Sequence, residues 1–220
     1  DYRKVFLFAA IPGILGIITV IFFVKEAKKN NNTLHHKILL KDFPKRYYFF
    51  LIIVFLFTLG NSTDALLLIK ASDVGIDNTF IPIMYLIFNS VSVAFSIPLG
   101  ILSDKIGREK LIIFGYIIYS IIYFAFGKTE SGAVVILLFA LYGLYSAATD
   151  GVQKALVSDI IQNDRKGTGL GIYNCITGIT LLPASVIAGA LYEHINYSVP
   201  FYFGSAMAFV SGILMIVFYL

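Results

Sequence analysis

The stretch TFIPIMYLIFNSVSVAFSIPLGILSDKIGREKLIIFGYIIYSIIYFAFG, residues 79–127, decides the fold class. It contains an apolar run at 79–102 and a second at 110–127, separated by a short charged connector. The hydrocarbon core of a bilayer is about 30 Å thick, and about 20 apolar residues in a helix cross it. Each run therefore has the length and composition of a membrane-spanning helix, and the connector has the polarity of a loop at the membrane surface.

The same pattern repeats along the whole chain of 220 residues. Apolar residues make up 58% and charged residues 14%, with a mean hydropathy of +0.84, whereas soluble domains have about 45–50% apolar and about 25% charged residues. Because unpaired backbone groups are costly in hydrocarbon, each span must be helical. We therefore predict an all-α polytopic membrane protein with about seven transmembrane helices, at residues 5–24, 47–69, 79–102, 110–127, 132–155, 168–192 and 199–220.

Lysines and arginines are unevenly distributed between the two sides of the membrane. With the loop at 25–46 in the cytoplasm, alternation of the spans puts the loops at 103–110 and 156–167 on the same side. These three loops carry twelve Lys and Arg residues, and the opposite side carries four. Because cytoplasmic loops are enriched in Lys and Arg, we expect a multi-pass membrane protein with its long basic loop in the cytoplasm.

The connector between the third and fourth spans combines small and charged residues in the order Gly100-Ile-Leu-Ser-Asp104-Lys-Ile-Gly107-Arg108-Glu-Lys110. Gly100 would permit close helix approach, and Gly107 would supply a tight turn. Asp104 would lie near the positive N-terminus of a neighbouring helix, and Arg108 would pair with a carboxylate at the membrane surface. From these residues alone, an ordinary hairpin whose charges stay hydrated is an equal alternative.

This connector resembles the signature loop of the major facilitator superfamily, Gly-x-x-x-Asp-x-x-Gly-Arg-x-Lys/Arg. Members of that family have twelve helices in two six-helix halves, with a relaxed copy of the signature between helices eight and nine. Counted from that copy, residues 1–24 resemble helix six, residues 25–46 resemble the basic cytoplasmic linker, and residues 47–220 resemble the C-terminal six-helix bundle.

The resemblance implies both the extent of the protein and its function. It implies that this chain is a C-terminal half with one preceding helix, and that a missing N-terminal helical half is its partner. It also implies secondary active transport of a small solute by alternating access, with protons as the expected coupling ion, in symport or antiport. The resemblance to bacterial-type members implies a bacterial-type plasma (inner) membrane. A truncated or degenerate membrane fragment, or a scaffold without transport activity, is the alternative.

Polar residues inside the predicted spans are candidates for a substrate or ion pathway, because charges near the bilayer centre are costly and usually face the bundle interior or water. Asn61 and Asp64 lie inside the second predicted span, where Thr58 would share their helix face. A carboxylate at the depth of Asp64 could take up and release a proton, which would suit proton coupling.

Two further groups of polar residues lie in the third and fifth predicted spans. Asp150 and Lys154 are four residues apart, so the acid and the base could pair along one helix face; a neutralised structural pair is an equal alternative to a pathway role. For Asn89, an interhelical hydrogen bond is the simpler role. Small residues that could pack closely on a partner helix follow the same four-residue step, at Gly143, Ala147, Gly151 and Ala155.

The resemblance assigns Gly100, Asp104, Gly107 and Arg108 to a cytoplasmic gate that holds the inner helix ends together. No catalytic constellation stands out, since the three histidines lie in predicted loops and no phosphate-binding Gly-Lys-Ser/Thr sequence is present. We therefore expect no enzyme activity, no cofactor, no metal site and no nucleic-acid partner. Lipid and a small-molecule solute are the expected partners.

Overall fold

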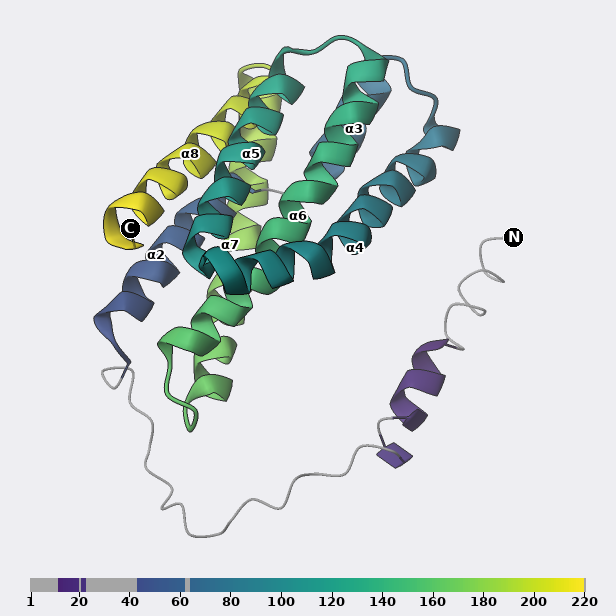
Figure 1. Ribbon diagram of the computed structural model, residues 1–220. Coiled ribbons are helices and arrows are strands. Elements are labelled where there is room, and N and C mark those ends of the chain that lie inside the picture. Colours follow the sequence, from purple (N-terminus) through teal and green to yellow (C-terminus); the bar gives the residue numbers. More distant parts are fainter. Residues whose placement is uncertain (1–11, 20, 23–42, 62–63, 220) are drawn as a thin grey trace. The chain divides into compact units, whose positions relative to one another are not determined.

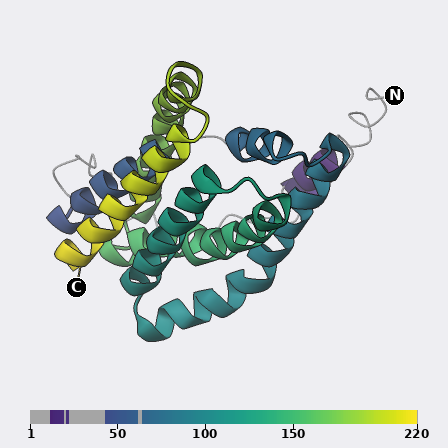
Figure 2. The same cartoon turned by 90° about the horizontal axis from the view of Figure 1, so that it is seen from above.

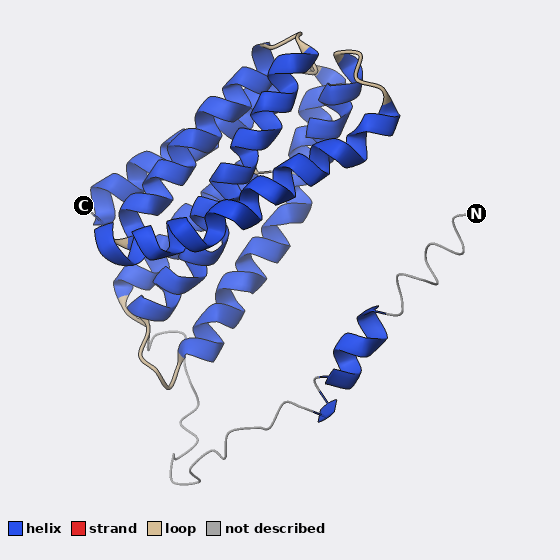
Figure 3. Cartoon of the chain, turned by 45° about the vertical axis from the view of Figure 1, so that its right-hand side comes forward, coloured by secondary structure: helices blue, strands red, loops and turns tan. Residues whose placement is uncertain are grey.

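The computed structural model describes residues 12–19, 21–22, 43–61 and 64–219, and the chain forms two compact units, Asp1–Ile38 and Leu39–Leu220. In the first unit, residues 12–19 and 21–22 are helical; the rest of the span predicted at 5–24 lies outside the described residues. So does the predicted linker at 25–46, except for residues 43–46. Every described element of the second unit is a helix (Figure 3).

The second unit contains six spans long and apolar enough to cross a membrane. In chain order its helices are α2 (Lys45–Gly60), α3 (Ala65–Asp73), the short 3₁₀ helix η2 (Asn78–Phe80), α4 (Ile81–Ile106), α5 (Arg108–Lys128), α6 (Gly132–Ile160), α7 (Lys166–His194) and α8 (Val199–Tyr219) (Figure 1). Helices α2 and α3 together make one span. The six spans predicted from residue 47 onward are confirmed, although α4 ends at 106 instead of 102 and α6 at 160 instead of 155.

Helices α5 and α6 form the centre of this bundle. Helix α5 packs against α8 and α6, and α4 packs mainly against α6; Figure 2 shows α4 along one edge. In the most apolar stretch of each helix, 61% of the residues are buried in α5 and 56% in α6, but only 6% in α4 and 17% in α7. Helices α4 and α7 therefore leave most of their surface uncovered by the described part of this chain.

Small and hydroxyl-bearing residues bring neighbouring helices together. A Cβ on Gly204 of α8 would lie 2.6 Å from the Gly60 carbonyl oxygen at the end of α2, so neither position has room for a side chain. The Ser120 hydroxyl of α5 donates to the Ser205 carbonyl of α8 at 2.9 Å, and the Ser205 hydroxyl donates to the Ser120 carbonyl at 2.7 Å. Such contacts suit a membrane interior, where lipid is as apolar as the side chains and hydrophobic burial drives little association.

The predicted stripe of small residues on α6 is confirmed only in part. A Cβ on Gly143 would lie 2.5 Å from the Phe88 carbonyl oxygen of α4, so this glycine permits close packing. A Cβ on Gly151 would meet nothing within 4 Å in the described part of the chain. The reason is that α4 changes direction along its length (Figures 1 and 2), with Pro98 inside the helix.

Candidate functional site

The first span of the second unit is interrupted in its interior. Helices α2 and α3 are separate, and Asn61 between them has non-helical angles of φ −93° and ψ 76°. The prediction of one continuous helix over 47–69, with Thr58 on the same face as Asn61 and Asp64, is therefore wrong. Thr58 is buried in the bundle, whereas Asn61 and Asp64 line a cavity.

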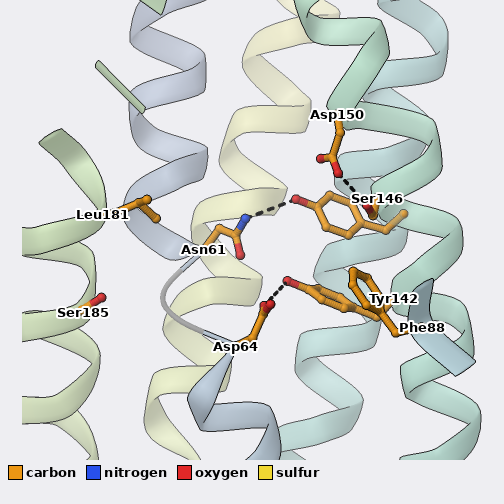
Figure 4. Close-up of a pocket in the computed structure, with 9 residues that line it drawn as sticks. Asn61, Asp64, Phe88, Tyr142, Ser146, Asp150, Leu181 and Ser185 are labelled. Carbon is orange, nitrogen blue, oxygen red and sulfur yellow. Dashed lines mark hydrogen bonds between the residues drawn. The ribbon is translucent and has the colours of Figure 1, made fainter. Parts of the chain in front are cut away.

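Tyrosines of α5 and α6 bind both sides of this interruption. The Asn61 amide donates to the Tyr145 hydroxyl at 3.2 Å, and the Asn61 Oδ1 accepts from the Tyr119 hydroxyl at 3.2 Å. The Tyr142 hydroxyl donates to Asp64 Oδ1 at 3.0 Å (Figure 4). These hydrogen bonds provide polar partners at a depth where water is scarce and an interrupted helix needs them.

A cavity of about 480 Å³ lies against the interruption. In Figure 4, Leu181 and Ser185 of α7 lie on one side of the view and Phe88 and Tyr142 on the other. The walls come from the α2–α3 junction and from α4, α6 and α7; the lining residues are Asn61, Asp64, Phe88, Tyr142, Tyr145, Ser146, Asp150, Leu181 and Ser185. The volume lies within the range of about 300–1,000 Å³ that small-molecule sites occupy.

Asp150 is bound by a hydroxyl group and not by Lys154. The Ser146 hydroxyl, one turn earlier in α6, donates to Asp150 Oδ2 at 2.5 Å and lies 3.2 Å from the Ser92 hydroxyl of α4. In the described residues no ion pair within 4 Å joins Asp150 to Lys154, so the predicted pair is wrong. The Asp150 side chain points back toward the preceding turn, as helical side chains do, and Lys154 is exposed outside the cavity lining.

Asn89 also lies away from the cavity. Its amide donates to the Tyr85 carbonyl of its own helix at 2.8 Å, and its side chain is exposed. The interhelical hydrogen bond considered for Asn89 is therefore not formed in the described structure. Of the predicted pathway residues, the structure brings together Asn61, Asp64 and Asp150 but not Asn89 or Lys154.

The cavity tyrosines were not predicted as site residues, because aromatic belts and lipid contacts explain most tyrosines in a membrane sequence. A signal was nevertheless present. Tyr142, Ser146 and Asp150 follow a strict four-residue step in α6, which places them on one helix face. That step links the tyrosine to the same surface as the carboxylate.

A second cavity, of about 290 Å³, shares Ser146 and Asp150 with the first. It follows the seam between α4 and α6 toward the α4–α5 connection. Its polar and charged lining residues are Ser92, Ser96, Ser103, Asp104, Arg108, Ser146 and Asp150. The linings of the two cavities together extend from the helix interruption to the connector at 103–110, with Ser146 and Asp150 common to both.

The α4–α5 connection consists of Gly107 alone, with φ +100° and ψ 136°, a conformation that favours glycine. The predicted turn is thus confirmed. Arg108 Nη2 lies 3.2 Å from Asp104 Oδ1, and Arg108 Nε pairs with Asp159 near the end of α6. The predicted pairing of Arg108 with a carboxylate is also confirmed, and it links the connector to a third helix.

The prediction for Gly100 is wrong, whereas the prediction for Asp104 is confirmed. A Cβ on Gly100 would meet nothing within 4 Å in the described structure, so the predicted close helix approach there is wrong. Gly100 lines the second cavity instead. Asp104 lies near the N-terminus of α5, where its carboxylate pairs with Arg108, the first residue of that helix.

Comparison with known proteins identifies the family. A family model described as Major Facilitator Superfamily matches residues 49–220. The chain belongs to the Major Facilitator Superfamily. The predicted family and the predicted all-α membrane fold are therefore confirmed, and the chain is an integral, multi-pass membrane protein.

Several members of the Major Facilitator Superfamily are similar to this chain in sequence. An uncharacterized MFS-type transporter of Methanocaldococcus jannaschii, MJ1317, is 38% identical over 98% of this chain and 56% of its own length. An uncharacterized transporter of Buchnera aphidicola is 31% identical over 61% of the chain and 33% of its own length. The quinolone resistance protein NorA of Staphylococcus aureus is 26% identical over 54% of the chain and 30% of its own length.

The chain thus spans little more than half the length of the first of these relatives and about a third of the others. The Methanocaldococcus and Buchnera relatives are both named as transporters.

Proposed function

We propose that this chain is part of a secondary active transporter that moves a small solute by alternating access and couples this movement to protons. The observation that carries the proposal is the cavity at the α2–α3 interruption, which holds Asp64 and Asp150 inside membrane-spanning segments. A charge at the centre of a membrane helix costs about 2.5–3.5 kcal/mol on insertion scales, and such residues usually serve function. The transporter names of two relatives, from Methanocaldococcus jannaschii and Buchnera aphidicola, support the same conclusion.

In this proposal Asn61, Asp64 and Asp150 form the substrate and ion pathway. Tyr142 donates to Asp64 and Ser146 donates to Asp150. Both donors are uncharged, so they stabilise each carboxylate without cancelling its charge. Either a proton or a solute can then neutralise the carboxylates, so binding of one can be coupled to binding or release of the other.

Gly100, Asp104, Gly107 and Arg108 form the proposed gate at the basic end of the bundle, the end that carries Arg46, Arg108 and Lys166. Arg108 joins the connector to α6 through Asp159, and the second cavity runs beside this contact. At the same end Arg46 Nη2 lies 2.7 Å from Glu109 Oε1. These exposed or half-exposed pairs are individually weak, which suits contacts that form and break during a transport cycle.

A second helical half is the proposed partner of this bundle. The cavity lies between α4 and α7, the two helices with the least buried surface. Lipid against this opening would leave two carboxylates facing hydrocarbon, which is costly. A further protein layer over α4 and α7 would instead enclose a polar route, and the 56% coverage of the first relative leaves length for such a layer.

We place the basic end on the cytoplasmic side of a plasma (inner) membrane, because Lys and Arg are enriched in cytoplasmic loops. Arg46, Arg108, Arg165 and Lys166 all lie at this end, near the α2 start, the α4–α5 connection and the α7 start. Cysteine replacements at Lys166 and at Asp77 test this orientation with a membrane-impermeant thiol reagent. Labelling of the Lys166 position, and not the Asp77 position, from outside whole cells would contradict it.

A flux experiment tests the function. The complete protein is placed in liposomes with an internal pH dye, a pH gradient is imposed, and a panel of cationic, neutral and anionic solutes is added. A transported solute should change the rate at which the gradient decays, and Asp64→Asn should remove this effect. If no solute in the panel changes the rate, the transport proposal is wrong and the scaffold alternative gains support.

Asp77→Asn is the matched control for this flux experiment. Asp77 lies in the exposed segment between α3 and α4, where the Thr79 hydroxyl and backbone N–H both donate to its carboxylate. These hydrogen bonds hold the pKa of Asp77 below its ordinary value. Asp77 therefore stays ionised near neutral pH, and its replacement should leave proton-coupled flux unchanged.

A further inference from the structure

We infer that the cavity at the α2–α3 interruption selects organic cations, that is, solutes that carry one positive charge and large apolar or aromatic groups. This inference rests on the proposed transport function and adds the chemical class of the solute. It follows from the charge of the cavity lining, from the aromatic rings in the cavity wall and from the cavity volume.

The charge of the lining has one sign. Asp64 and Asp150 are the ionisable acids among the described lining residues, and the described lining contains no lysine, arginine or histidine. Arg108 lines the neighbouring cavity, but it is already paired with Asp104 and Asp159. An anionic solute would meet two carboxylates and no base in the described lining. A cation would neutralise carboxylate charge at the cavity surface, because Lys154, the base that acts on Asp150, lies outside the lining.

The wall beside these carboxylates is aromatic. Phe88, Tyr142 and Tyr145 line the cavity, with ring centroids 5.2 Å apart for Phe88–Tyr142 and 5.3 Å for Tyr142–Tyr145. The faces of such rings carry partial negative charge and attract cations. The tyrosine rings are fixed by their hydrogen bonds to Asp64 and Asn61, so they are ordered before a solute arrives.

The size of the cavity favours an organic cation over a bare metal ion. A volume of about 480 Å³ exceeds what a single metal ion needs, and no group of three or more metal-ligating side chains occurs among the described residues. Leu181 supplies an apolar contact on the α7 side. A solute with a diffuse charge and an apolar body uses both the carboxylates and the rings.

The test compares two ions of nearly the same shape and opposite charge, tetraphenylphosphonium and tetraphenylborate. Binding of each to the purified complete protein is measured by equilibrium dialysis, with empty detergent micelles as the blank. We expect tetraphenylphosphonium to bind at least about tenfold more tightly than tetraphenylborate, as one well-placed charge contact gives. Equal binding, or preference for the anion, overturns the inference, and this comparison requires no variant.

Variants then locate the site. Asp64→Asn and Asp150→Asn should each weaken tetraphenylphosphonium binding about tenfold, while Asp77→Asn should not change it. Phe88→Leu keeps apolar volume but removes a ring face, and should weaken binding a few-fold. Variants that elute from size exclusion like the wild type are compared; unchanged affinity in both carboxylate variants would show that the cation binds elsewhere.

Failure of the inference is distinguishable from failure of transport. If the flux experiment shows exchange of neutral or anionic solutes only, transport stands and the cation assignment is wrong. If tetraphenylphosphonium binds through Asp64 and Asp150 but no solute is exchanged, the cation assignment stands and transport is wrong.

Discussion

At the residue scale, the Tyr142 hydroxyl holds the Asp64 carboxylate in place beside the cavity. It donates to Asp64 Oδ1 at 3.0 Å, while its ring remains part of the cavity wall. Ser146 plays the same part for Asp150, from one turn earlier in α6. Each cavity carboxylate thus depends on a neutral donor from α6, and the two can be perturbed one hydroxyl at a time.

Tyr142→Phe removes the hydroxyl group and keeps the ring. We expect the free energy of unfolding to fall by about 1–2 kcal/mol, because a part-buried carboxylate oxygen loses its donor. Tyr202→Phe is the control, since Tyr202 is 38% exposed on α8, away from the cavity; its effect should stay within about 0.5 kcal/mol. Denaturant unfolding in micelles measures both, and equal losses would show that Tyr142 does not support Asp64.

Alanine substitutions at Gly107 and Gly100 compare a strained glycine position with an unstrained one. Gly107→Ala should destabilise the protein by about 1–3 kcal/mol, because φ +100° is strained for any residue with a Cβ. Gly100→Ala should be neutral or stabilise by up to about 1 kcal/mol, because the position is helical and open. The same unfolding measurement applies, and a Gly107→Ala variant as stable as Gly100→Ala would contradict the turn assignment.

Among the elements, the interrupted span is the feature that the sequence predicted least well. Hydropathy gives the length of a span but carries no information about hydrogen bonds from other helices. Asn61 leaves helical geometry at the end of α2, where tyrosines of α5 and α6 supply partners to Asn61 and Asp64. Those partners are 58 and 78 residues away in the chain, so the interruption is a tertiary effect that local propensity does not show.

The close packing of α4 on α6 gives a prediction at the element scale. Gly143→Ala should destabilise the bundle by about 1–3 kcal/mol, because its Cβ would lie 2.5 Å from the Phe88 carbonyl oxygen. Gly151→Ala, two helical turns later on the same stripe, meets nothing within 4 Å and should be neutral or slightly stabilising. Thermal unfolding of the two variants compares them directly; similar melting temperatures would refute the packing described for Gly143.

The contact between the connector and α6 gives a prediction about gating. Asp104→Asn and Asp159→Asn each remove one carboxylate from Arg108, and both carboxylates are more than half exposed, so stability should change by less than about 1 kcal/mol. Access to the second cavity should nevertheless rise. Faster reaction of a Gly151→Cys variant with a soluble thiol reagent measures this, and an unchanged rate in both variants would remove these residues from the gate.

At the scale of the whole molecule, the sequence predicted the features that depend on local composition. It did not predict the features that depend on which helices pack against one another. Six spans, the connector turn and the pairing of Arg108 follow from hydrophobic length, from a glycine and from nearby charge. The gathering of Asn61, Asp64 and Asp150 into one cavity with tyrosine walls requires α6 to lie against the α2–α3 junction. Asn89 and Lys154 share the polarity of the site residues, but both are exposed outside the cavity lining, Asn89 on α4 and Lys154 one turn beyond Asp150 in α6. A span prediction does not distinguish such positions from the lining.

Reciprocal accessibility of the two ends of the cavity pathway tests the central claim most directly. In the complete protein, with Cys175→Ala as background, Ser185→Cys reports the α7 side of the first cavity and Gly151→Cys reports the second cavity toward the basic end. We predict that reversing an imposed pH gradient, or adding saturating solute, raises the thiol-labelling rate at one position and lowers it at the other. Rates that rise and fall together, or that do not respond at all, would contradict alternating access through this cavity.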